Sequence, residues 1–112
     1  MAVTYSISLP NPQQARGADA AFSFTANGAE AFAEQLQRAL SDPAWFERWR
    51  NAQAEPDEVD PALGATDADA KVSGSQADLR INLLATTTLP GEIVRHRMDL
   101  LAGKGWELRN VR

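Results

Sequence analysis

The feature that most constrains this chain is a long segment, from Ala77 to Leu89, in which side chains alternate between two faces. One face carries Leu79, Ile81, Leu83, Ala85, Thr87 and Leu89, and the other is polar except for Leu84. A period of two indicates a β-strand with one buried and one solvated face. Its length suits the centre of a sheet, so we expect Leu79, Ile81 and Leu83 at the middle of the core.

Three other segments have the character of strands. Residues 3–9 and 21–26 also alternate, and a short strand is expected at 106–111, after the glycines that follow the last helix. The first of these segments lacks the basic region of a signal peptide, so we interpret it as a strand. Pro10 and Pro12 end it. The sequence therefore predicts four strands.

Three helices are expected between these strands. An apolar stripe after Asn27 predicts a first helix that ends near Leu40, and Asp42 followed by Pro43 begins a second one. A third helix is expected over residues 91–102. The predicted order is β-β-α-α-loop-β-α-β. This order predicts a single α+β domain over residues 1–112, with a small, mostly antiparallel four-stranded sheet and helices packed on one face.

The loop in this order is the acidic segment 55–76. It holds six acidic residues against one lysine, a net charge of −5, whereas the whole chain carries −4. The rest of the chain is therefore close to neutral. The segment has no aromatic residue and few large apolar ones, so it cannot bury enough surface to offset the entropy of ordering. We expect a mobile acidic loop, either a tolerated insertion or a segment that binds a partner.

Composition excludes several classes of function. The chain has no cysteine and one histidine, which leaves no thiolate metal site, no cysteine nucleophile and no site with two imidazoles. The nearly neutral body lacks the basic surplus of nucleic-acid-binding proteins, and no apolar run approaches the roughly 20 residues of a membrane span. We expect no metal, cofactor, nucleic acid or membrane partner, and a cytoplasmic location. Arginine in excess of lysine and abundant alanine suggest a bacterial source with a GC-rich genome.

The third helix holds the candidate chemistry. Arg97 falls inside its apolar stripe, so its stem either crosses the edge of the core while the guanidinium reaches solvent, or the guanidinium binds an anion. That anion would be a ligand or a carboxylate of the chain, with Glu107 and Asp78 as the candidates. Glu92 and His96 are four residues apart, which fits either a general-base dyad or an ion pair on a solvated face.

The second helix mixes aromatic and arginine side chains in Trp45-Phe46-Glu47-Arg48-Trp49-Arg50. At helical spacing such a stripe is a core face; if exposed, it is a partner interface, because tryptophan and arginine anchor many interfaces. Stacking on nucleic-acid bases is a third, weaker reading. A two-fold homodimer that buries the stripe is the simplest closed assembly. The candidate interface residues are Trp45, Phe46, Trp49 and Arg50.

The C-terminal segment from Leu100 to Val111 resembles the ending of a short bacterial domain family of unknown function. In that family a helix runs through a Gly-x-x-Gly-Trp-Glu-Leu turn into a terminal strand. Here Ala102 stands at the first glycine, and Gly105-Trp106-Glu107-Leu108 supplies the rest. The resemblance implies a small α+β sheet domain and carries over no functional residue.

These observations favour a protein-binding or assembly module whose partner is another protein or a second copy of the chain. No Ser-His-acid motif is present, so no catalytic residue is predicted and an enzyme is the weaker hypothesis. The alternative is a small-molecule or anion-binding protein, or an enzyme, with a pocket near Arg97, His96 and Trp106.

Overall fold

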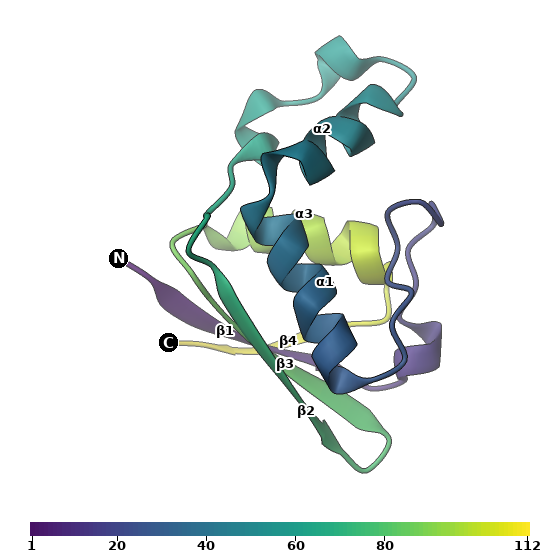
Figure 1. The fold of residues 1–112 in the computed structure, drawn as a ribbon, viewed down its shortest axis with the longest axis vertical. Helices are drawn as coiled ribbons and strands as arrows, with labels where there is room; N and C mark the ends of the chain where they lie inside the picture. Colours follow the sequence, from purple (N-terminus) through teal and green to yellow (C-terminus); the bar gives the residue numbers. More distant parts are fainter.

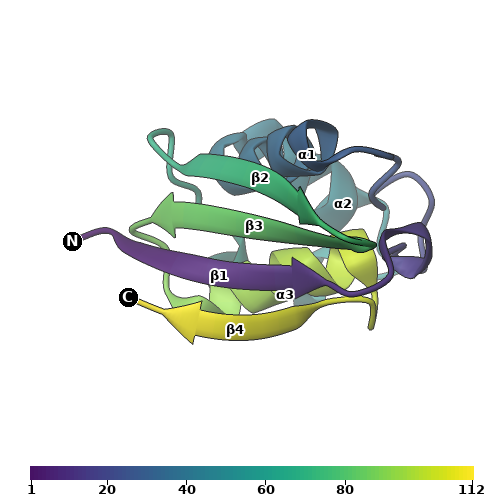
Figure 2. The same cartoon turned by 90° about the horizontal axis from the view of Figure 1, so that it is seen from below.

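Four antiparallel strands form one sheet, and three helices pack on one of its faces (Figure 1, Figure 2). The computed structural model describes residues 1–112. Its strands are β1 (Val3–Leu9), β2 (Lys71–Ala77), β3 (Arg80–Thr87) and β4 (Glu107–Val111). Its helices are α1 (Ala29–Ser41), α2 (Pro43–Asn51) and α3 (Gly91–Ala102). The predicted α+β class is confirmed. No helix has the length and apolar character needed to cross a lipid bilayer.

The two central strands, β1 and β3, supply the floor of the core. They pair antiparallel over their whole length, with Ile7 opposite Leu83, and the order across the sheet is β2-β3-β1-β4. Side chains that face the helices are buried, whereas Thr86 on the open face of β3 is exposed. The period of two in the sequence thus corresponds to one covered and one open face of the sheet, as expected.

The prediction that Leu79 lies at the centre of the core is wrong. The chain reverses at Asp78 and Leu79, which form the two-residue turn between β2 and β3, and Asp78 adopts a left-handed backbone with φ of 58°. Leu79 stands at the tip of this hairpin with 84% of its surface exposed. Ile81 and Leu83 are buried as expected. The alternation continues through Leu79, but the strand does not.

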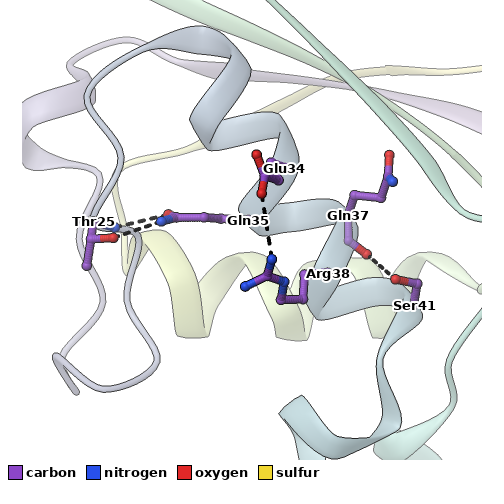
Figure 3. A network of polar contacts seen from close by, with 6 residues as sticks. All are labelled: Thr25, Glu34, Gln35, Gln37, Arg38 and Ser41. Carbon is purple, nitrogen blue, oxygen red and sulfur yellow. Dashed lines mark hydrogen bonds and ion pairs between the residues drawn. The ribbon is translucent and has the colours of Figure 1, made fainter.

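The predicted strand at 21–26 is also absent, although its apolar side chains are buried as the alternation requires. Its backbone bonds to helices instead of to another strand. The Phe24 N–H donates to the Leu101 carbonyl of α3 at 2.8 Å, and the Thr25 N–H donates to the side-chain oxygen of Gln35 at 3.0 Å (Figure 3). Periodicity reports which side chains are buried, but it does not identify the partner of the backbone.

The remaining strand of the sheet, β2, lies almost entirely inside the segment 55–76, which was predicted to be one acidic loop. Residues 71–77 form β2, and two short 3₁₀ turns at Pro56–Glu58 and Pro61–Gly64 precede it. The observed order is therefore β-α-α-β-β-α-β. The sequence of β2, KVSGSQA, hides its strand character because Gly74 and Gln76 stand on its covered face in place of the usual apolar residues. Mobility of the remaining residues stays a prediction.

The turn from α3 into β4 depends on glycine. Gly103 ends the helix with φ of 60°, a left-handed conformation that favours glycine, and a Cβ there would lie 2.7 Å from the Arg16 carbonyl oxygen. The predicted helix over 91–102 and the terminal strand after it are confirmed, except that the strand begins at Glu107. Trp106 belongs to the turn.

A matched pair of substitutions tests which side chains form the core. Ile81→Ala should lower the free energy of unfolding by roughly 2–5 kcal/mol, because Ile81 is 1% exposed and its removal leaves a cavity. Leu79→Ala should change it by less than about 0.5 kcal/mol, as expected for an exposed position. Urea denaturation of both variants gives the two values. Equal losses would contradict the placement of the hairpin turn.

Candidate functional site

Arg97 lies at the junction of α1, α3 and the segment that follows α2. Its side chain is 0% exposed, and each of its three nitrogen atoms donates to a backbone carbonyl. Nε donates to Ala39 at 3.0 Å, Nη1 to Leu63 at 2.7 Å and Nη2 to Ala65 at 3.1 Å. The first of these carbonyls belongs to the last turn of α1, which lacks partners within the helix. The arginine therefore caps one helix from the inner face of another.

Aromatic rings complete the surroundings of this guanidinium. Its central carbon lies 4.8 Å from the centre of the Phe46 ring and 5.9 Å from that of Trp45. Burial lowers the pKa of Arg97 to about 10, so the group is still charged at neutral pH. Two of the expectations for its surroundings are wrong: the guanidinium does not reach solvent, and neither Asp78 nor Glu107 binds it.

The side chain of His96, which precedes Arg97 in α3, packs against a different residue. Its ring packs edge-on against Trp49, with 5.0 Å between the ring centres, and it makes no ion pair with Glu92. Its Nδ1 atom is buried without a hydrogen-bond partner. Burial and the nearby charge of Arg97 lower the pKa of His96. The geometry of a general-base dyad is therefore not present.

Trp106 lies apart from both residues. Its indole N–H donates to the carboxylate of Asp99 at 3.0 Å. One side of the ring borders a cavity of about 230 Å³ whose other polar walls are Asn11, Gln14, Lys104 and Glu107. Neither Arg97 nor His96 lines that cavity. Trp106 thus lies apart from Arg97 and His96, and the structure does not bring the three candidate ligand-binding residues into one pocket.

The aromatic stripe of α2 is mostly core. Trp45 and Phe46 are buried, and Trp49 is half-buried against Phe46. Arg50 is half-buried and donates to the Pro56 carbonyl at 3.1 Å. Of the alternatives for this stripe, core packing is the one observed for Trp45 and Phe46, which leaves little apolar surface for a partner or a second copy to cover.

A second anchor holds the acidic segment close to Arg97. The Asp67 N–H donates to the Leu40 carbonyl at the end of α1, and its carboxylate accepts from the Thr87 hydroxyl at 2.8 Å and the Thr88 N–H at 3.1 Å. The hydrogen bonds that the carboxylate accepts from Thr88 and Thr87 lower the pKa of Asp67. Together with the bonds from Arg97, they attach residues 63–67 to the body of the domain.

One candidate surface was missed by the sequence analysis. On the open face of the sheet, a depression of about 700 Å³ lies beside the β2–β3 turn. Two exposed leucines line it, Leu79 and Leu84, the latter 47% exposed. Arg80 and Arg109 line it as well. We call these four residues the hairpin face. The sequence feature that could have revealed this surface is Leu84, the one apolar residue on the polar side of the alternation.

Removal of the Arg97 guanidinium tests its structural role. Arg97→Met keeps much of the apolar stem but leaves three carbonyls without donors, and each orphaned buried acceptor costs about 1–3 kcal/mol. We expect a loss of at least about 3 kcal/mol in the free energy of unfolding, with faster proteolytic cleavage at residues 61–70. Arg38→Met on the exposed face of α1 is the matched control. A variant as stable as the parent would refute this role.

His96, the sole histidine of the chain, predicts a pH dependence. Because its pKa in the folded protein lies below the ordinary value of 6.5, the unfolded chain takes up the proton first as the pH falls. The free energy of unfolding should therefore decrease below about pH 6.5 and level off below the folded-state pKa. His96→Gln should remove this step in urea titrations between pH 7.5 and 5. A step that persists in the variant would contradict the assignment.

Comparison with protein-family models, curated proteins and solved structures finds no match to this chain. The C-terminal resemblance therefore stays a prediction, and function has to be argued from the geometry described above.

Proposed function

We propose that the protein is a protein-binding module and that the hairpin face holds an acidic segment of the partner that carries an aliphatic side chain. One observation carries the proposal: Leu79 and Leu84 are both exposed and line the same depression, with Arg80 and Arg109 beside them. Exposed leucines that cluster at one depression, with polar side chains around them, are typical of binding surfaces.

The architecture of the hairpin favours binding at this place. A two-residue turn joins two paired strands, so the backbone that carries Leu79 is already ordered. Binding then costs little additional conformational entropy. A protruding leucine on a rigid turn fits an apolar pocket of a partner, and the adjacent depression receives a side chain in return.

The charges around the depression specify the chemistry of the partner. Its lining contains two arginines, Arg80 and Arg109, and a single carboxylate, Asp78. Arg80 makes no ion pair, and Arg109 lies 3.6 Å from the exposed carboxylate of Glu107. Because arginine is favoured at interfaces and pairs with carboxylates through two parallel hydrogen bonds, an acidic partner segment is the best match.

The other proposal, a ligand pocket near Arg97 and Trp106, has less support. The guanidinium of Arg97 is wholly enclosed by protein carbonyls and rings, and the cavity beside Trp106 does not reach it. A second copy docked on the α2 stripe is also less well supported, because Trp45 and Phe46 are already buried within one chain.

Selection from a random peptide library displayed on phage tests the proposal. The intact protein should enrich peptides that combine leucine or isoleucine with aspartate or glutamate. Leu79→Ser and Arg80→Gln should each weaken binding of a selected peptide by about tenfold or more, which corresponds to about 1.4 kcal/mol. The matched control is Arg48→Gln, an exposed arginine on α2. The proposal is refuted if no acidic peptide is enriched, or if the acidic peptides bind both substituted variants as tightly as the parent.

A further inference from the structure

A second surface lies on the opposite side of the fold from β4, where α1 meets the outer edge of the sheet. A groove of about 380 Å³ runs between them. Its walls are Glu30, Ala33, Glu34 and Gln37 of α1 and Val72, Ser73 and Gly74 of β2. In Figure 2, β2 is the last strand on this side, and α1 is visible beyond it.

The edge of β2 presents backbone groups that have no strand partner. In an antiparallel pair, every second residue turns its N–H and C=O away from the neighbouring strand. The Val72 N–H donates to the side-chain oxygen of Gln37 at 2.9 Å instead of to β3, which identifies the outward set. Gly74 and Gln76 are in phase with Val72, so their backbone groups also face away from β3.

Gln37 occupies the place of a missing strand. Its amide oxygen accepts from Val72 as the carbonyl of a fifth strand would. A flexible side chain in this position can swing aside when a real strand arrives, at the loss of one hydrogen bond that the new strand replaces. The edge of β2 is thus capped at one point and left open beyond it. The opposite edge of the sheet, β4, is less suited to pairing, because a register shift interrupts its ladder with β1 and because it carries charged residues.

The position of α1 decides what kind of chain fits beside β2. The helix packs so closely over this strand that Gly74 has no room for a side chain beneath the Ala29 carbonyl. A second copy paired through β2 would place its own α1 over a strand about 4.8 Å away, whereas packed helices need about 8–10 Å between axes. A bare extended peptide, which brings no helix, avoids this clash.

The helix wall of the groove indicates the side chains of that peptide. Glu30, Glu34 and Gln37 follow one another along the same side of α1, and Ala33 and Val72 form an apolar floor. Glu30 makes no ion pair, and Glu34 contacts only the exposed Arg38, at 3.6 Å. Alternate side chains of an added strand would face this wall, so basic residues at those positions are complementary to its glutamates, and the residues between them face the open side of the sheet.

We infer that the α1–β2 groove binds an extended basic peptide as a fifth strand of the sheet. Backbone hydrogen bonds to the edge of β2 supply the affinity, and the glutamates of α1 select lysine or arginine, in the manner of other proteins that recognise peptides by strand addition. The site does not involve the hairpin face and does not depend on the proposed function.

Nuclear magnetic resonance of the intact, ¹⁵N-labelled protein tests the inference. The probe is a capped peptide of alternating lysine and valine. Its addition should shift the backbone amides of residues 72–76 and slow hydrogen exchange at Gly74 and Gln76. A peptide of the same sequence with an N-methyl group on every backbone nitrogen has no N–H to donate to the ladder and should not bind. Equal binding of the methylated peptide, or shifts confined to the hairpin face, would overturn the inference.

Substitutions separate strand addition from general attraction between charges. Glu30→Gln combined with Glu34→Gln should weaken binding of the lysine–valine peptide by about fivefold or more at low salt, since both carboxylates that attract the lysines are then removed. The matched control, Glu47→Gln combined with Glu92→Gln, removes the same charge from α2 and α3 and should leave affinity within about twofold. Equal weakening by both pairs would refute selection by the groove.

Discussion

The buried positive charge of Arg97 determines how the helices of this domain pack against one another. A charged group in the interior is tolerated only if its donors are satisfied, and here no carboxylate does so. Three carbonyls from two distant segments and two aromatic faces take that role. The end of α1, the 3₁₀ turn at Pro61–Gly64 and the first turns of α2 must therefore all converge on the inner face of α3.

This requirement explains why the acidic segment is part of the fold and not an appendage. Its residues supply carbonyls at Leu63 and Ala65 for the arginine, and Asp67 then bonds to both the end of α1 and the end of β3. Backbone dipoles make the bonds to Arg97, whereas the bonds that reach the end of β3 are made by the carboxylate of Asp67. Apart from that of Asp67, the carboxylates of the segment remain at the surface or bond locally in turns.

The sequence predicts the elements that depend on their own residues. The bounds of β1 and α3 agree with the patterns of alternation and of the apolar stripe, and glycine marks the end of α3. The secondary-structure predictions are wrong where a partner far away in the chain determines the conformation of a segment. Residues 21–26 look like a strand because their side chains are buried, yet their backbone bonds to α3 and α1. Residues 71–77 do not look like a strand, since α1 covers their inner face so closely that glycine replaces a large apolar residue.

The candidate sites also combine features that local residues determine with features that distant partners determine. The sequence singles out Arg97 because a charge interrupts an apolar stripe, but its partners lie 58, 34 and 32 residues away along the chain, and no local pattern identifies them. Leu79 is misassigned for a related reason. The alternation of β3 extends through it, and only the position of β2 reveals that the chain has already turned.

The topology also determines when this domain can form during synthesis. β1 lies in the interior of the sheet, yet both of its neighbours, β3 and β4, are encoded far downstream; the hydroxyl groups of Thr4 and Thr86, which bond across the first pair, are 82 residues apart in the chain. Until those strands leave the ribosome, β1 has no partner and α1 has no sheet to cover. The apolar side chains of the nascent chain therefore stay exposed during synthesis. Most of the domain folds in one step after β3 and β4 emerge.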